Sequence, residues 1–261
     1  MIGIFDSGIG GLTVVRALMK QLPGYDIIYF GDTARTPYGS KSPDTVVQYS
    51  IENTEFLLKK GAKIIIMACN TASSVAFEKV TEKFHYPLFE VISPAVKLSI
   101  KRSEKKRIGV IGTRATINSG AYENKIKEIS PEARVYSTPC PLLVPIVEEG
   151  WLKKPETNMI IKKYLYPLKI KQVDTLILGC THYPLLKNII QRKMGMKVNI
   201  IDSSFSTAEN VKNFLQKNPG IDCKMSKKGE AVFFVSDLTP QFEKIAKVVL
   251  RKNICLEHVK T

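Results

Sequence analysis

The stretch that decides the fold reads Ile64-Ile65-Ile66-Met67-Ala68-Cys69-Asn70-Thr71. Its apolar residues form one continuous run, which is typical of a strand buried on both faces of a parallel sheet. Asn70 and Thr71 have side chains that favour the start of a helix. A second stretch has the same design and reads Thr175-Leu176-Ile177-Leu178-Gly179-Cys180-Thr181-His182. Each stretch therefore predicts a buried strand that ends in a cysteine, directly before a helix.

These two stretches are part of a longer internal repeat. Ile2-Gly3-Ile4 is echoed by Ile108-Gly109-Val110, and each precedes its cysteine at a similar spacing. Similar spacing predicts two copies of one unit, although chance similarity between strand-turn-helix segments is the alternative. We expect a first domain over residues 1–94 and 206–261, and a second over residues 95–205. The last helices, after Ser206, are expected to pack back on the first domain.

Other short apolar runs alternate with amphipathic patterns, such as Leu12, Val15, Leu18 and Leu22. Further strands are expected at residues 2–5, 27–30, 88–92, 108–111, 135–137, 198–201 and 232–235. Alternating strands and helices predict an α/β protein with parallel sheets and ligands at the carboxyl ends of the strands. The expected architecture is two similar doubly wound α/β domains, related by a quasi-twofold axis, with the active site in the cleft between them.

The composition limits the class of protein. The chain has 261 residues, of which 44% are hydrophobic and 24% are charged. That is enough for one large core or two modest ones, and it excludes collagen, coiled coils and disorder. No apolar run approaches the ~20 residues that a bilayer requires, so we expect no membrane contact. The sequence opens without the basic segment of a signal peptide, which predicts a cytoplasmic protein.

The formal net charge of +15 raises the question of nucleic-acid binding. The basic residues are scattered, and the densest run, residues 101–107, has no aromatic side chain on which a base could stack. A solvated cationic surface is therefore the favoured interpretation, and nucleic acid is not an expected partner. A positive field would attract a small anionic substrate.

The five cysteines are Cys69, Cys140, Cys180, Cys223 and Cys255. Their number is odd and none form a CxxC pair, so neither a disulfide framework nor a metal site is predicted. Cys140, Cys223 and Cys255 are interpreted as small buried hydrophobic residues.

Cys69 and Cys180 are different because each is expected at the start of a helix. Backbone N–H groups and the helix dipole stabilise a thiolate there, which predicts a pKa below the usual value of about 8.5. Two such groups fit a reaction that removes a proton from one face of a carbon and returns one to the other. The alternative is a hydrolase that uses Cys180 and His182, in which Cys69 would have no role.

Two polar loops follow the first two strands. Asp6-Ser7-Gly8-Ile9-Gly10-Gly11 lacks the third glycine of a dinucleotide fingerprint, so cofactor binding is not favoured. Asp6 is suited to pairing with an ammonium group or to modulating an acid/base group, although a helix cap is the alternative. Ser7 and the N–H groups after it suit a carboxylate. In the loop at residues 31–39, backbone N–H groups near Tyr38 and Gly39 are expected to bind an anion, unless this is an ordinary surface turn.

In these motifs the sequence resembles the glutamate racemases of bacterial cell-wall synthesis. The resemblance covers nearly the whole chain, and its segments follow one another in the order of the family. They are Phe5-Asp6-Ser7-Gly8-Ile9-Gly10-Gly11, residues 31–39, Ala68-Cys69-Asn70-Thr71-Ala72, Gly179-Cys180-Thr181-His182-Tyr183-Pro184-Leu185 and Phe234-Val235-Ser236-Asp237.

The resemblance implies a cofactor-independent racemase that interconverts L- and D-glutamate for peptidoglycan synthesis, and thus for cell wall biogenesis and cell shape. Carried over, Cys69 would deprotonate D-glutamate with help from Asp6, and Cys180 would deprotonate L-glutamate with help from His182. Asp32 and Glu148 would be supporting acids, although Glu149 is an alternative for the second. A homodimer is also expected. The residues that would hold the substrate are Asp6, Ser7, Tyr38, Gly39, Asn70, Thr71, Thr113, Thr181 and His182.

Two alternatives to this function stay open at this point. One is a related racemase that acts on another amino acid, such as aspartate. The other is a regulatory protein that binds nucleic acid or a topoisomerase and retains the cysteine pair, which the net charge of +15 motivates.

Overall fold

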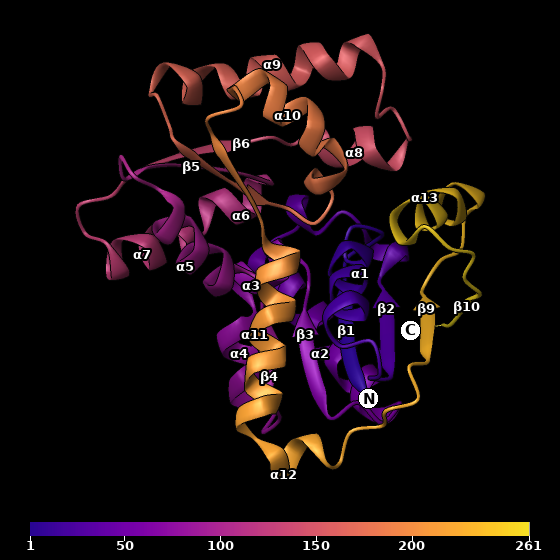
Figure 1. Ribbon diagram of the computed structural model, residues 1–261. Helices are drawn as coiled ribbons and strands as arrows, with labels where there is room; N and C mark the ends of the chain where they lie inside the picture. Colours follow the sequence, from indigo (N-terminus) through magenta and orange to yellow (C-terminus); the bar gives the residue numbers. More distant parts are fainter. Residues whose placement is uncertain (261) are drawn as a thin grey trace.

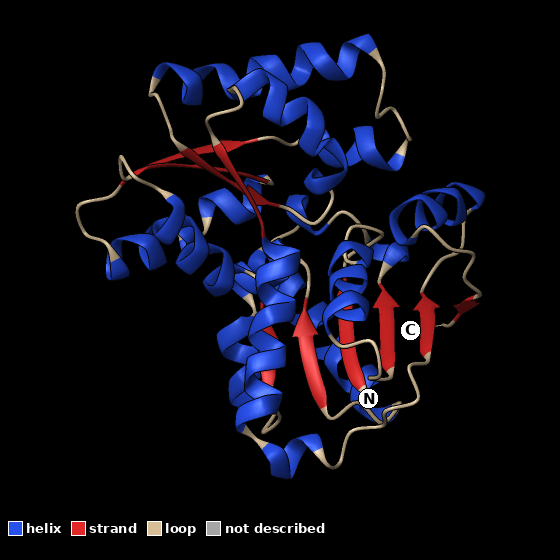
Figure 2. Ribbon diagram, in the orientation of Figure 1, coloured by secondary structure: helices blue, strands red, loops and turns tan. Residues whose placement is uncertain are grey.

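The computed structural model describes residues 1–260, over which strands and helices alternate (Figures 1 and 2). The strands are β1 (Ile2–Asp6), β2 (Ile27–Gly31), β3 (Ile64–Met67), β4 (Leu88–Glu90), β5 (Arg107–Gly112), β6 (Arg134–Pro139), β7 (Thr175–Gly179), β8 (Asn199–Asp202), β9 (Ala231–Val235) and β10 (Leu256–His258). The helices are α1 (Leu12–Gln21), α2 (Pro43–Lys59), α3 (Asn70–Val75), α4 (Phe77–Lys83), α5 (Ile92–Arg102), α6 (Arg114–Asn118), α7 (Ala121–Ile129), α8 (Leu143–Glu148), α9 (Pro155–Ile170), α10 (Lys187–Met194), α11 (Ser203–Lys217), α12 (Pro219–Asp222) and α13 (Pro240–Leu250), with 3₁₀ turns η1 (Thr33–Arg35), η2 (Tyr38–Ser40) and η3 (Tyr183–Leu186).

The strands form two sheets, and every strand pair is parallel. One sheet has the order β10-β9-β2-β1-β3-β4, and the other has the order β6-β5-β7-β8. Helices cover the sheets, and the two sheets lie in separate parts of the molecule (Figure 2). The predicted α/β fold with parallel sheets is confirmed. We call the six-stranded sheet with its covering helices the first unit, and the four-stranded sheet with its helices the second unit.

The internal repeat is visible in the strand order. The run β2-β1-β3-β4 of the first sheet matches the run β6-β5-β7-β8 of the second, strand for strand. Gly3 pairs with Ile28 and Ile65, and Gly109 occupies the corresponding place between Tyr136 and Leu176. The domain boundaries at residues 94/95 and 205/206 stay a prediction.

The helix after Cys69 differs from the prediction of one helix that reaches Phe84. It is divided into α3 and α4 at Ala76, whose backbone has φ −115° and ψ −14°. The Ser73 and Ser74 hydroxyls donate to the backbone carbonyls of Met67 and Thr71. Serine hydroxyls that bond to nearby backbone groups compete with regular helix, which explains the short first segment.

Two strands also differ from expectation. The strand predicted at residues 88–92 ends at Glu90, because the Glu90 carboxylate accepts from the backbone N–H of Ser93 at 2.9 Å and so caps α5. The edge strand β10, which pairs with β9, was not predicted. It has three residues and only one of them, Leu256, is apolar, so no periodic pattern marks it.

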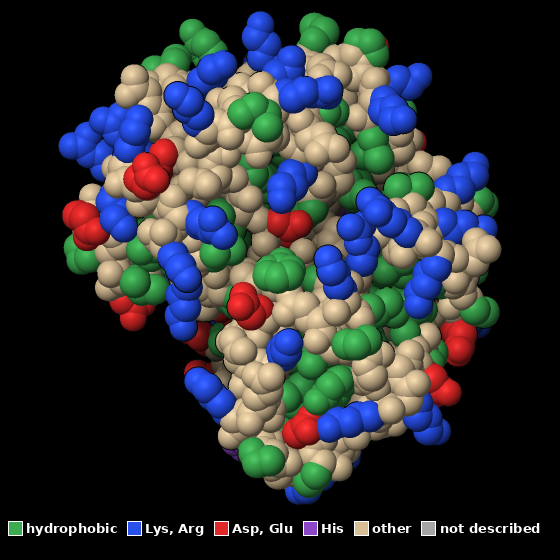
Figure 3. Space-filling view, in the orientation of Figure 1, with side chains coloured by type: hydrophobic (Ala, Val, Ile, Leu, Met, Phe, Trp, Pro, Cys, Tyr) green, Lys and Arg blue, Asp and Glu red, His purple; other side chains and the backbone are tan. Residues whose placement is uncertain are grey.

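The last helices return to the first unit. α11 and α13 both pack on α1, while α5 packs on β7, β8 and α7 of the second unit. Lys and Arg side chains are spread over both units on the face shown in Figure 3, without one dominant patch. Among residues 1–260, no helix combines the length and apolar character that crossing a bilayer would require.

Gly3 and Gly109, which occupy equivalent places in the two sheets, allow a matched test of how tightly each sheet is packed. An added Cβ at Gly3 would lie 2.7 Å from Ala62 Cβ, whereas at Gly109 the nearest atom would be the flexible Leu176 Cδ1 at 3.1 Å. We expect Gly3→Ala to lower the free energy of unfolding by about 1–3 kcal/mol through overpacking, and Gly109→Ala to lower it by less than about 1 kcal/mol. Urea unfolding of both variants measures this difference, and equal losses would contradict it.

Candidate active site

The carboxyl ends of the central strands of both sheets meet around one small, largely buried cavity. Ser7 follows β1 and Cys69 follows β3, while Thr113 follows β5 and Cys180 follows β7. The cavity has a volume of about 10 Å³. It is lined by Ser7, Pro37, Tyr38, Gly39, Cys69, Asn70, Thr71, Thr113, Val144, Cys180, Thr181 and His182. The structure thus brings together most of the site residues predicted from the sequence, whereas Asp6, Asp32 and Glu148 lie outside the lining.

The two thiols have different neighbours. Cys69 is 5% exposed, and its thiol donates to Ser7 Oγ at 3.6 Å. Cys180 is 6% exposed, and its Sγ lies 3.7 Å from His182 Nδ1. One thiol is therefore next to a neutral hydroxyl, and the other is next to an imidazole ring.

The prediction of a lowered pKa is wrong for Cys69. Burial raises the pKa of the Cys69 thiol to about 12, and the negative charge of Asp6 acts in the same direction. The backbone N–H of Ala72 and the Ser7 hydroxyl oppose this rise, as expected at a helix start. Because α3 has only six residues and the thiol is buried, desolvation outweighs the helix terminus. Cys69 is therefore a neutral thiol near pH 7.

His182 is 2% exposed, and its Nε2 lies 3.1 Å from Glu148 Oε1. Burial alone would lower the pKa of His182, but hydrogen bonds to Cys180 and Glu148, together with their charges, raise it well above its usual value. The ring therefore has a proton on each nitrogen and a positive charge. Cys180 thus has a positively charged hydrogen-bond partner, which Cys69 lacks.

Asp6 lies behind the cavity and is completely buried. Its Oδ2 accepts from the backbone N–H groups of Gly8 and Gly11, at 3.1 and 2.9 Å, and its Oδ1 accepts from the Thr181 hydroxyl at 3.2 Å. Burial raises the pKa of Asp6, whereas the charge of His182 and these donors lower it. Asp6 therefore holds the loop before α1 but is not its helix cap, because the N-cap position is Gly11 and no side chain caps this helix. It also contacts the loop that carries Cys180.

Asp32 supports the loop that carries Tyr38 and Gly39. It is fully buried and accepts from Arg35 Nε at 2.7 Å, from the Ser236 hydroxyl at 3.0 Å and from the Tyr38 hydroxyl. Arg35 and Ser236 lie in segments that carry the family resemblance, but the sequence indicated no role for either of them. Their role is visible only once β9 lies beside β2, which brings Ser236 close to Asp32.

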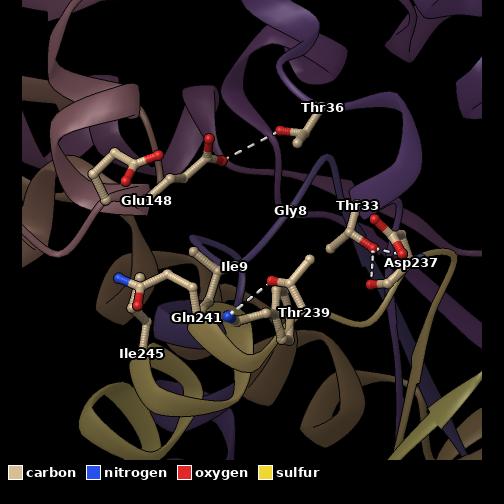
Figure 4. Close-up of a pocket in the computed structure, with 11 residues that line it drawn as sticks. Gly8, Ile9, Thr33, Thr36, Glu148, Asp237, Thr239, Gln241 and Ile245 are labelled. Atoms are coloured by element: carbon tan, nitrogen blue, oxygen red, sulfur yellow. Dashed lines mark hydrogen bonds between the residues drawn. The ribbon is translucent and has the colours of Figure 1, made fainter.

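Glu148 borders a second, more open pocket of about 430 Å³ next to the cavity. Figure 4 shows its carboxylate reaching the Thr36 hydroxyl, with an oxygen–oxygen distance of 3.4 Å. The Glu148 side chain is 29% exposed. It is Glu148, rather than its neighbour Glu149, that bonds to His182.

Several contacts across the two units were not predicted. Thr71 Oγ1 of the first unit lies 3.0 Å from Thr113 Oγ1 and 3.1 Å from Thr116 Oγ1 of the second. The Tyr122 hydroxyl, on α7, donates to Asn70 Oδ1 at 2.5 Å. Thr116 and Tyr122 lie in amphipathic helices, where the sequence pattern indicates only that they are buried. Nothing in the sequence indicates which unit their hydroxyl groups face.

Comparison with known proteins agrees with this arrangement. The profile of the family described as Asp/Glu/Hydantoin racemase matches residues 9–210. Curated proteins named glutamate racemase from Persephonella marina and Aquifex aeolicus are each 47% identical to this chain, over 98% and 97% of it and 95% of their own lengths.

Solved structures agree as well. The structure of a glutamate racemase isoform from Bacillus anthracis superposes with a TM-score of 0.93 at 37% identity, covering 100% of this chain and 97% of that one. A glutamate racemase from Francisella tularensis, solved in complex with D-glutamate, superposes with a TM-score of 0.91 at 39% identity, over 99% and 97% of the two chains.

Close contact between the two units leads to a prediction about Gly10. An added Cβ there would collide with Thr181 Oγ1 and lie 2.7 Å from His182 Nδ1. We expect Gly10→Ala to hold the units apart and expose Cys69 and Cys180, so that both react with a thiol reagent at least about tenfold faster through opening of the site. Peptide mapping after timed labelling measures each rate.

Gly24→Ala is the matched control, because an added Cβ there would meet no atom within 4 Å. Cys223 and Cys255 are exposed, so the prediction that they are buried is wrong, and both should react quickly in every variant. Unchanged labelling of Cys69 and Cys180 in Gly10→Ala would show that this contact does not keep the site closed.

Proposed function

The chain belongs to the glutamate racemases of the Asp/Glu/Hydantoin racemase family, and we propose that it interconverts L- and D-glutamate without a cofactor, using Cys69 and Cys180 as paired acid and base. The observation that carries this proposal is that two thiols, from matched strand ends of two units, line one small, largely buried cavity. Racemisation removes a proton from one face of Cα and adds one to the other. It therefore needs one acid/base group on each side of the substrate.

The different neighbours of the two thiols support a division of roles. Cys69 is the neutral thiol, and Cys180 lies beside the protonated His182, so we assign the thiol role to Cys69 and the base role to Cys180 in the first state. In this state Cys180 takes the α-proton of L-glutamate, and Cys69 gives its proton to the opposite face, which forms D-glutamate. The thiolate and thiol are then exchanged, and this second state performs the reverse reaction.

An α-proton beside a carboxylate is weakly acidic, so the site must stabilise the negative charge that develops. We infer that Ser7, Gly39, Asn70, Thr71 and Thr181 hold the substrate carboxylates and ammonium group, as the family resemblance implies. These residues line a buried cavity, where hydrogen bonds from oriented donors are stronger than in water. A dry cavity also leaves the Cys180 thiolate poorly solvated and hence more basic toward the substrate.

The cavity must open before it can bind glutamate. Its volume of about 10 Å³ corresponds to one water molecule at most. We propose that the two units separate to admit substrate and close around it, so that the reaction takes place without bulk water. The net charge of +15 attracts the anionic substrate to the open site.

The biological role proposed here follows the family resemblance. D-glutamate produced in the cytoplasm would supply peptidoglycan synthesis, and thereby cell wall formation and cell shape. The homodimer stays a prediction.

Loss of either thiol should stop the reaction. We expect Cys69→Ser and Cys180→Ser each to lower racemisation by about 10²–10⁴-fold in both directions, because each removes the acid/base group of one face. Circular dichroism of the substrate in D₂O measures the rate, and mass spectrometry should find deuterium at Cα of the wild-type product. Cys223→Ser, which alters an exposed thiol, is the control. Full activity in either site variant would refute the paired mechanism.

Glu148 should set the alkaline limit of activity. Its charge and hydrogen bond raise the pKa of His182, so Glu148→Gln should lower that pKa and move the alkaline fall of kcat/KM to lower pH. Because the two enantiomers have equal free energy, kcat/KM must fall by the same factor in both directions.

Profiles of kcat/KM against pH for the wild type, Glu148→Gln and the exposed neighbour Glu149→Gln measure this effect. The Glu149 variant should follow the wild-type profile. A shift of the alkaline limit to higher pH in Glu148→Gln would contradict the role given to His182.

A further inference from the structure

We propose that Tyr122 is a positioning residue that orients the Asn70 amide toward a carboxylate of the substrate, and that it does so only when the two units are closed. This inference rests on the proposed function, because it assigns a task within the same cavity. Tyr122 itself does not line the cavity, and it acts through Asn70.

The place of Tyr122 in the fold is the first support. The residue is on α7 of the second unit and is 2% exposed. Its ring packs beside Gly179, where an added Cβ would lie 3.1 Å from Tyr122 Cε2, and its hydroxyl donates to Asn70 Oδ1 at 2.5 Å. Gly179 directly precedes Cys180, and Asn70 directly follows Cys69. One side chain therefore contacts both strand ends that carry the thiols.

The state of the Asn70 amide is the second support. Its oxygen is occupied by Tyr122, whereas its Nδ2 is buried and has no hydrogen-bond partner among residues 1–260. Asn70 is 2% exposed and lines the cavity. Buried polar groups are normally paired, so an unpaired donor in the wall of a cavity indicates a site for an acceptor of a ligand.

The chemistry of that acceptor follows from the amide. An asparagine side chain has one accepting end and one donating end. With the oxygen held by Tyr122, the donating end is left for the ligand, which fits a carboxylate. In the opposite orientation the amide oxygen would face the carboxylate and repel it. Burial keeps the pKa of Tyr122 well above its usual value, so its hydroxyl stays a donor.

The contact also depends on closure. Asn70 belongs to the first unit and Tyr122 to the second, so separation of the units breaks this hydrogen bond. The amide is then free to rotate, and the oriented donor is present only in the closed site. Tyr122 thus couples the position of the second unit to carboxylate binding by the first.

The test is Tyr122→Phe, which removes only the hydroxyl. We expect KM for both enantiomers to rise by about tenfold, because a hydrogen bond to a charged group is weakened, while kcat changes by less than about threefold. Tyr183→Phe is the matched control. The Tyr183 hydroxyl is also buried, but it donates to the Cys140 carbonyl at 2.9 Å within the second unit. Thermal unfolding should show comparable losses of stability in the two variants, whereas only Tyr122→Phe should change KM.

A double-mutant cycle separates positioning from a general structural effect. In an Asn70→Ala background, Tyr122→Phe should cause no further rise in KM, because the amide that it orients is absent. Equal KM values in Tyr122→Phe and the wild type would overturn the inference. So would a KM in the double variant that rises by the product of the two single-variant factors. The wild type is assayed first with both enantiomers. Failure of the wild type to racemise glutamate would overturn the proposed function instead.

Discussion

The structure depends on the close approach of two strand ends, one from each unit. This approach removes Cys69 and Cys180 from water. It is possible because glycines, which have no Cβ atom, lie at the contact. An added Cβ at Gly39 would lie 2.6 Å from Thr113 Cγ2, and the same constraint applies at Gly10. Burial then determines the chemistry, since it keeps Cys69 protonated and places the charged His182 ring against Cys180 with little water around it.

The fold is nearly symmetric, but the environments of its two thiols are not. The repeated strand order places both thiols at equivalent strand ends, and the residues beside them then differ. Cys69 has Ser7 as its neighbour, whereas Cys180 has the pair formed by His182 and Glu148. A racemase can use such asymmetry, because only one thiol needs to be ionised at a time and the other must hold a proton.

The sequence predicted the parts of the fold that depend on local pattern. Continuous apolar runs located the strands, and the motifs at their ends predicted most residues around the cavity. The raised pKa of Cys69 could not be predicted, because it depends on how completely the second unit covers the first. The hydroxyl contacts of Thr116 and Tyr122 depend on packing between units in the same way. Periodicity indicates that a residue is buried, but it does not indicate which polar group its hydroxyl meets.

The contact between the units explains how a cavity too small for the substrate can serve a reaction that requires substrate exchange. The apolar clusters on the two faces of the first sheet centre on residues such as Ile66 and Met67, and those of the second sheet on Ile177 and Leu178. The units meet at the site through polar pairs, including Thr181 with Asp6 and Tyr122 with Asn70. Water can replace such hydrogen bonds at a net cost of only about 0.5–1.5 kcal/mol each, whereas separating a shared apolar core would expose a large area to water. Because each unit keeps its own core, the site can open without loss of the fold, and closure restores both the dry cavity and the orientation of its donors.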